Sequence, residues 1–155
     1  MKPYFPPVAL LCDALGITTD EIYTSKTATV DVAALRKLVE VALGNVSIDP
    51  TVYASQNPDL ERSIGYDGIK LNEHFVKVGY FEGRAFPWAR FDSAFYLKAY
   101  ADIAAAFRSK SLGDPFKHFQ DRGVYEARLP NAACQDEVDS WWAIINQNGK
   151  KSGAK

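Results

Sequence analysis

The apolar residues of the chain recur at the spacing of α-helices, and strand-like alternation of apolar and polar residues is nearly absent. The first apolar stripe follows the i, i+3, i+4, i+7 pattern and consists of Val8, Leu11, Cys12 and Leu15. Gly16 follows this stripe as a helix stop. Thr18 and Glu21 then have the spacing of a capping box, which predicts a second, short helical turn.

Two further stripes predict longer helices. One helix is expected over residues 31–44, with Asp31 as its N-cap and Gly44 at its end. Its predicted apolar face consists of Val32, Leu35, Val39 and Ala42. The stripe of the other helix, near the C-terminus, consists of Val138, Trp141, Trp142 and Ile145.

The middle of the chain contains one pattern twice, in residues 48–84 and in residues 91–128. The first parts of the copies align without a gap and pair Asp49 with Asp92, Tyr53 with Tyr96, and Asp59 with Asp102. After a one-residue insertion, His74 matches His118, Gly79 matches Gly123, Glu82 matches Glu126, and Arg84 matches Arg128. Matched residues are 43 positions apart before the insertion and 44 after it. A period of this length is typical of one supersecondary unit that is repeated and stacked.

Each copy is predicted to form three short helices. The expected N-caps are Asp49, Asp92 and Asp114, with Asp67 or Asn72 as the alternatives for the last helix of the first copy. Gly79 and Gly123 follow the last helices, and we expect both to have a positive φ, which side chains disfavour.

These elements predict an all-α fold of two stacked repeats, each made of three short helices. The predicted division is an N-terminal helical annex over 1–46, repeat 1 over 47–88, repeat 2 over 89–131, a C-terminal capping helix over 132–147 and a disordered tail over 148–155. In this arrangement the C-terminal helix covers the open end of the stack.

Composition and charge argue against several classes of protein. A net charge of −1 argues against a general nucleic-acid binder, because phosphate contacts need clustered Lys and Arg. The two cysteines, Cys12 and Cys134, make neither a zinc site nor a disulfide framework, so we expect free thiols in a reducing compartment. No stretch has the length of a membrane span, and we expect a cytoplasmic protein.

The repeated residues resemble a bacterial helical repeat with the pattern FD-x3-YL-x2-NPD, a variable loop, and DP-x2-HF-x3-G-x2-EGR. The first copy contains IDPTVY, NPDL and EHFVKVGYFEGR; the second contains FDSAFYL and DPFKHFQDRGVYEAR. The second copy departs from the pattern with Tyr-Ala-Asp in place of NPD and with Glu-Ala-Arg in place of EGR. The resemblance covers residues 48–131. It implies an association with bacterial glycosyltransferase and polysaccharide-biosynthesis proteins, beside which such repeats occur.

The repeated polar residues are the first candidate site. They are His74, Glu82 and Arg84 in repeat 1, and His118, Glu126 and Arg128 in repeat 2. Histidine and carboxylates could form a general-base or metal site, but each copy has too few such ligands for a metal ion. We expect a structural cluster that braces the turn after each glycine, and neither a metal ion nor a cofactor.

Aromatic residues give the other two candidates. Four rings near the junction of the repeats could stack on a glycan: Tyr66, Tyr80, Phe86 and Trp88. We expect instead that Phe86, Trp88 and Phe91 bury the seam where one repeat packs on the next, and the glycan site is the alternative. Val138, Trp141, Trp142 and Ile145 either cap the stack or bind a partner, since Trp is enriched in binding hot spots.

The sequence contains no phosphate-binding glycine loop, nucleophile elbow or HExxH motif. The function that we expect is therefore a non-enzymatic adaptor whose protein partner is a glycosyltransferase or an envelope-assembly component. A glycan-binding module and a small enzyme with a site around His74 and His118 are the alternatives. The open ends of a two-repeat stack also allow a homo-oligomer.

Overall fold

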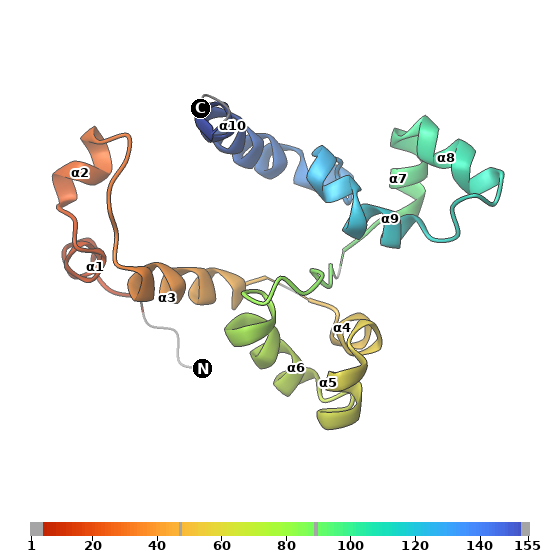
Figure 1. Ribbon diagram of the computed structural model, residues 1–155, viewed down its shortest axis with the longest axis horizontal. Coiled ribbons are helices and arrows are strands. Elements are labelled where there is room, and N and C mark those ends of the chain that lie inside the picture. Colours follow the sequence, from red (N-terminus) through yellow and green to blue (C-terminus); the bar gives the residue numbers. More distant parts are fainter. Residues whose placement is uncertain (1–4, 47, 89, 153–155) are drawn as a thin grey trace.

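The computed structural model describes residues 5–46, 48–88 and 90–152, and its helices confirm the all-α class (Figure 1). Within these residues, the one β-type pairing is an isolated antiparallel bridge between Ile48 and Trp88. None of the described helices combines the length and apolar character that crossing a membrane requires.

Three helices form the N-terminal annex: α1 (Val8–Leu15), α2 (Thr19–Thr24) and α3 (Val32–Leu43). Their predicted end signals are confirmed. Gly16 ends α1 in the left-handed conformation with φ +74°, the Thr18–Glu21 capping box starts α2, and the Asp31 carboxylate accepts a hydrogen bond from the Ala34 N–H.

The predicted apolar face of α3 is right for Val39 and wrong for the other three residues, which are exposed: Val32, Leu35 and Ala42. Val32 is 76% exposed and Leu35 is 45% exposed, whereas Leu43 is buried. Leu43 and Val39 pack into the core of repeat 1. The helix is held at its C-terminal end by repeat 1 and on another side by α1, so no single stripe describes its contacts.

Each repeat contains three short α-helices, as expected. Repeat 1 has α4 (Pro50–Gln56), α5 (Pro58–Ser63) and α6 (Gly68–His74), which continues into a π-helical turn, η1 (Phe75–Gly79). Repeat 2 has α7 (Ser93–Ala99), α8 (Ala101–Arg108) and α9 (Pro115–Asp121), followed by a 3-10 turn, η2 (Gly123–Glu126). Asp49, Asp67, Asp92 and Asp114 accept backbone N–H bonds as N-caps, so of the two alternatives for α6, Asp67 is the cap.

The core of each repeat forms around its repeated tyrosine. Tyr53 and Tyr96 are fully buried, and each packs edge-to-face on the phenylalanine that follows the repeated histidine. The Asp49 N–H donates to the Pro87 carbonyl, and the Asp92 N–H donates to the Pro130 carbonyl, both at 2.9 Å. The chain therefore enters and leaves the two repeats in the same way.

Gly79 and Gly123 do not have the positive φ that we expected. Glycine is required there for another reason, because a Cβ at Gly79 would overlap the Tyr53 hydroxyl and a Cβ at Gly123 would overlap the Tyr96 hydroxyl. The constraint is close packing of a tyrosine on the backbone, and it is the same in both repeats.

The repeats meet at a narrow seam. The Gln56 and Gln120 side-chain amides bond each other, and the Gln120 Nε2 also donates to the Phe86 carbonyl at 2.9 Å. Trp88 joins the two cores, since it packs on Phe86 and on Phe119. The extensive helix–helix contacts lie within each repeat, so the stacked arrangement stays a prediction.

The C-terminal helix differs from its prediction. After a 3-10 turn, η3 (Ala132–Cys134), α10 runs over Gln135–Ser152, so the helix passes the expected end at residue 147. Of the predicted tail, residues 148–152 belong to this helix and residues 153–155 lie outside the described residues. The extensive contacts of α10 are with η3, which directly precedes it in the chain, so the cap that we expected over the end of the repeats stays a prediction.

Candidate functional site

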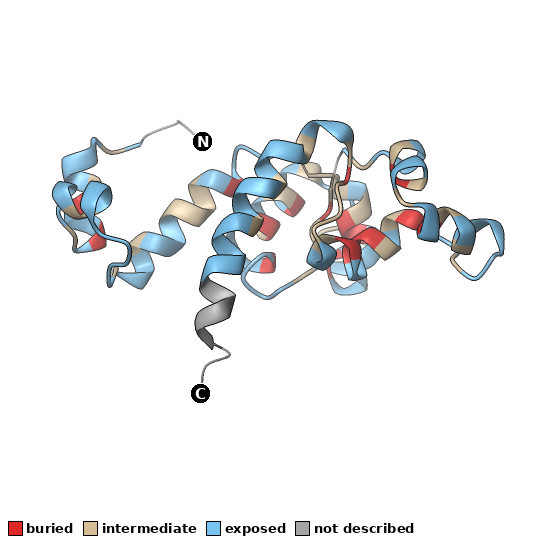
Figure 2. Cartoon of the chain, turned by 90° about the horizontal axis from the view of Figure 1, so that it is seen from above, coloured by how far each residue is buried: buried red, intermediate tan, exposed pale blue. Residues whose placement is uncertain are grey.

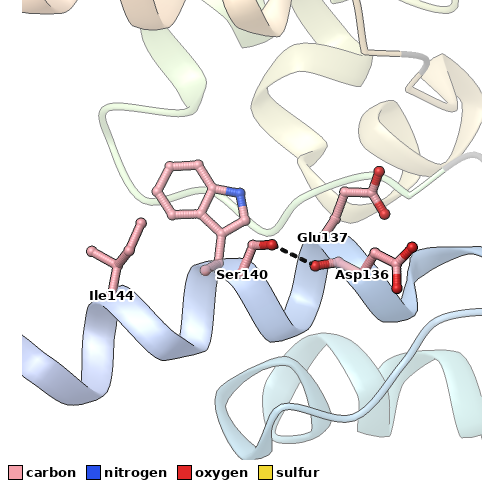
Figure 3. A pocket seen from close by; sticks show the side chains of 5 residues that line it. Asp136, Glu137, Ser140 and Ile144 are labelled. Carbon is pink, nitrogen blue, oxygen red and sulfur yellow. Dashed lines mark hydrogen bonds between the residues drawn. The ribbon is translucent and has the colours of Figure 1, made fainter. Parts of the chain in front are cut away.

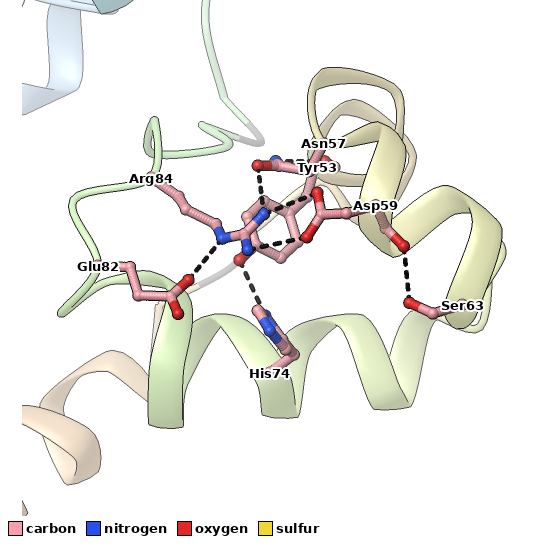
Figure 4. Close-up of polar contacts among 7 residues, drawn as sticks. All are labelled: Tyr53, Asn57, Asp59, Ser63, His74, Glu82 and Arg84. Atoms are coloured by element: carbon pink, nitrogen blue, oxygen red, sulfur yellow. Dashed lines mark hydrogen bonds and ion pairs between the residues drawn. The ribbon is translucent and has the colours of Figure 1, made fainter.

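The repeated polar residues of repeat 1 come together in one cluster at the edge of its core (Figure 4). From α4, the Tyr53 hydroxyl shares a hydrogen bond of 3.1 Å with Nδ1 of His74, which is half-buried on α6. Arg84, in the segment after η1, lies against the same tyrosine and contacts the carboxylates of Asp59 and Glu82. The cluster thus joins all three helices of the repeat to the segment that leaves it.

The guanidinium of Arg84 is the centre of this cluster. Its two terminal nitrogens bond the two Asp59 carboxylate oxygens at 3.0 and 2.9 Å in a bidentate pair. Its Nε donates to Glu82 at 2.8 Å, and one terminal nitrogen also donates to the Asn57 side-chain oxygen at 2.9 Å. These contacts use every nitrogen of the guanidinium.

Repeat 2 has the same cluster with nearly the same geometry. Tyr96 and His118 are 3.0 Å apart between hydroxyl and Nδ1. Arg128 makes a bidentate pair with Asp102 at 3.0 and 2.8 Å, and its Nε donates to Glu126. In both repeats the histidine bonds a buried tyrosine, and the arginine bonds the glutamate of its own repeat. The structure adds Asp59 and Asp102 as the bidentate partners of the arginines.

One member of the cluster differs between the repeats. Asn57 accepts from Arg84 and donates to the Tyr53 carbonyl in repeat 1, and Tyr100 has its place in repeat 2. The Arg128 guanidinium lies over the Tyr100 ring, 4.8 Å from its centre, and the Tyr100 hydroxyl accepts from the Leu129 N–H. A cation–π contact therefore replaces an amide hydrogen bond, which explains how the repeat tolerates Tyr-Ala-Asp in place of Asn-Pro-Asp.

Burial and ion pairing move the pKa values of several groups in the clusters. Burial raises the pKa of Tyr53 and that of Tyr96 to about 12 each, since the charged phenolate loses its hydration. The hydrogen bonds from Arg128 lower the pKa of Asp102 to about 2, and those from Arg84 lower the pKa of Asp59. At neutral pH both tyrosines are therefore neutral and both aspartates are ionised.

The polar groups of each cluster bond mainly to one another. The acceptors of Asp59 bond Arg84, and the His74 Nδ1 bonds a neutral tyrosine, so these atoms are already used within the fold. Across the described ranges 5–46, 48–88 and 90–152, there is no group of three or more His, Cys, Asp or Glu side chains placed to hold a metal ion. The geometry suits bracing of the fold.

The aromatic junction residues separate into two groups. Phe86 and Trp88 are half-buried, with ring centres 4.5 Å apart, and they belong to the seam. Tyr80 is 42% exposed and packs edge-to-face on Phe81. Tyr66 is 56% exposed and donates its hydroxyl to Glu61 within repeat 1. Of the four rings, the pair Phe86–Trp88 is therefore tied to the seam, whereas Tyr66 and Tyr80 are more exposed.

Helix α10 carries the other predicted site. Figure 2 shows this helix exposed over most of its described surface. Trp141 is 67% exposed and Ile145 is 47% exposed, whereas Val138 and Trp142 are half-buried. The sequence analysis missed Ile144, which is 53% exposed and follows Trp141 by three residues, a spacing that could have indicated it.

A shallow hollow of about 220 Å³ lies on the exposed side of α10. Its lining residues are Asp136, Glu137, Ser140, Trp141 and Ile144 (Figure 3). The Ser140 hydroxyl is bonded to the Asp136 carbonyl at 2.7 Å, so it is used within the helix. The hollow combines an apolar floor with carboxylates at one end.

A second hollow, of about 250 Å³, lies between α1 and α3 in the annex. Its lining is almost wholly apolar and includes Leu11, Leu38 and Val41, with Lys37 at its edge. Lys37 is the one titratable side chain among its lining residues. The nearby Cys12 is buried, and both it and Cys134 are free thiols.

Comparison of the chain with models of protein families, with curated proteins and with solved structures finds no match.

Proposed function

We propose that the chain is a non-enzymatic cytoplasmic adaptor that binds a protein partner through the exposed apolar side of α10. The observation that carries this proposal is the exposure of Trp141, Ile144 and Ile145 on one helix. Large apolar side chains that gather on an exposed surface are typical of a protein–protein interface, and tryptophan is the residue type most enriched in binding hot spots.

The polar clusters favour an adaptor over an enzyme. An enzyme with a site at His74 or His118 needs these groups to converge on a substrate, whereas their nearest partners are buried tyrosines of the core. The same cluster occurs twice with matched distances, which suits a device that holds each repeat together. Phe86 and Trp88 at the junction pack on each other and on the core rings Phe75 and Phe119, and this gives less support to a glycan-binding module.

The pathway in this proposal rests on the sequence resemblance alone. Repeats with the pattern of residues 48–131 occur beside bacterial glycosyltransferase and polysaccharide-biosynthesis domains. A glycosyltransferase or an envelope-assembly protein is therefore the partner that we propose for α10.

The test is affinity capture of the tagged chain from the cells that naturally produce it, with mass spectrometry of the proteins that are enriched. Trp141→Ala removes the most exposed ring of α10. Tyr125→Ala is the matched control, because Tyr125 is 74% exposed on a different element. We expect one glycosyltransferase or assembly protein to be captured by the wild type and by Tyr125→Ala, and to be lost with Trp141→Ala.

Binding of the captured protein is then measured with both proteins purified. A partner whose affinity is unchanged by Trp141→Ala would contradict the placement on α10. Specific capture of glycans by the purified chain, with no protein partner, would contradict the adaptor function itself.

A further inference from the structure

The exposed side of α10 has the residue spacing of a helix-pairing seam. Glu137, Trp141 and Ile144 are separated by four and three residues. In the sequence, Asn148 and Lys151 continue this spacing. Alternating steps of four and three residues keep the side chains of a helix on one face along its whole length, as in coiled coils. The side chains of Glu137, Trp141 and Ile144 are all exposed on this face.

Charge is distributed unequally along this helix. Its first turn carries Asp136 and Glu137, and Glu137 belongs to the seam. In the sequence, the last turn carries Lys150 and Lys151. The two ends of one helix thus have opposite charge, and Ile144 is midway between positions 137 and 151.

We propose that α10 pairs antiparallel with α10 of a second copy of this chain. A two-fold axis near Ile144 would bring the two isoleucines together and would place Glu137 of each copy beside position 151 of the other. The contact is isologous, so one surface serves both copies. A parallel pair would instead bring the acidic first turns together, and like charges at an interface oppose association.

The antiparallel direction also suits the helix dipoles. The negative C-terminal end of one helix lies beside the positive N-terminal end of the other. The seam from position 137 to position 151 is about 21 Å long at 1.5 Å per residue. Such an interface is smaller than that of a standard stable complex, so we expect a dimer that dissociates on dilution between about 100 and 1 μM.

This pairing does not rest on the proposed function, although it uses the same side of α10. A partner protein would have to displace the second copy. The experiment below uses only the purified chain, so its outcome is independent of whether a partner is found in cells.

The test is sedimentation velocity of the full chain over this concentration range. The wild type should change from monomer to dimer, and Trp141→Ala with Ile144→Ala should stay monomeric at the highest concentration. Glu137→Lys should weaken the dimer at least tenfold, and the double variant Glu137→Lys with Lys151→Glu should restore it. Asp139→Lys is the matched control: it makes the same charge change on the opposite side of α10 and should leave the dimer unchanged.

Three results would overturn the proposal. They are a monomer at all concentrations, a dimer that persists without Trp141 and Ile144, and a failure of Lys151→Glu to restore the dimer that Glu137→Lys weakens. Circular dichroism of each variant checks that its helix content is that of the wild type, since all these substitutions lie on α10.

Discussion

Gly83 and Ala127 have the same position in the two repeats and the same left-handed backbone, with φ +72° and +57°. Each residue precedes the cluster arginine of its repeat. The turn requires this conformation in both copies, but only repeat 1 has the residue that adopts it without strain. The change from Glu-Gly-Arg to Glu-Ala-Arg therefore places a strained alanine in repeat 2.

The first prediction is a reciprocal effect of substitution at these two positions. Gly83→Ala should lower the free energy of unfolding by about 1 kcal/mol, and Ala127→Gly should raise it by about as much. No atom would obstruct a Cβ at Gly83, so the effect comes from the backbone alone. Urea denaturation followed by circular dichroism measures both.

Gly113→Ala is the control for this pair. A Cβ at Gly113 also meets no atom, and the backbone there does not have a positive φ. It should be neutral or slightly stabilising, because alanine restricts the unfolded chain. Equal effects of Gly83→Ala and Gly113→Ala would contradict the assignment of strain.

A second prediction concerns the contact between Gly79 and Tyr53. Gly79→Ala should destabilise the fold by about 1–3 kcal/mol, as overpacking of a core does, because the new Cβ overlaps the tyrosine hydroxyl. Tyr53→Phe should cost stability by itself, since it removes the bond to His74. The double variant should cost less than the sum of the two, by about 1 kcal/mol or more.

The two single variants and the double variant form a double-mutant cycle, and repeat 2 allows the same cycle with Gly123 and Tyr96. The same coupling should appear there, because a Cβ at Gly123 would overlap the Tyr96 hydroxyl. Strict additivity in both cycles would show that the glycines are needed for another reason.

A third prediction concerns acid stability. The pKa of Asp102 is lowered to about 2 by the bonds from Arg128, from the ordinary value of 3.8. A carboxylate with a lowered pKa stabilises the fold above its unfolded pKa, and this contribution is lost as the pH falls through the folded pKa. Asp102→Asn should therefore lower stability most at pH 5 and above, and its difference from the wild type should shrink between about pH 4 and pH 2.

The measurement is urea unfolding at a series of pH values. Asp13→Asn removes an exposed carboxylate from α1 and is the control for the change in net charge. A difference between the wild type and Asp102→Asn that stays constant from pH 6 to pH 2 would show that the ion pair does not stabilise the fold.

The sequence predicted those features that depend on local chemistry or on the repeat itself. Helix caps such as Asp31 and Asp114 bond their own neighbours, so spacing alone identified them. The repeated cluster was found because the chain contains it twice. Tyr100 was not predicted to replace Asn57, because a ring under a guanidinium and an amide beside it have no common sequence signature.

The faces of α3 and α10 were less accessible to sequence analysis. Periodicity predicts which residues of a helix are apolar, but not what lies beside them. Val32 and Leu35 continue the stripe of α3 and are exposed, because the contacts of this helix are at its other end and on another side. For α10, periodicity likewise gave Val138, Trp141, Trp142 and Ile145 as one stripe, but it could not say which of them are exposed.

The last prediction concerns the titration of the tyrosines. Burial raises the pKa of Tyr53 and Tyr96 to about 12, and the chain has eight tyrosines in all. A raised pKa means that the neutral form stabilises the fold below the unfolded pKa of about 10, and that this stabilisation is lost as the pH rises towards 12. The absorbance of tyrosinate near 295 nm should therefore show a late step that coincides with loss of helical circular dichroism.

Tyr53→Phe and Tyr96→Phe should each remove part of this step, whereas Tyr125→Phe should leave it intact. A late step that is unchanged in Tyr53→Phe and Tyr96→Phe would contradict the burial of these two hydroxyls in the polar clusters.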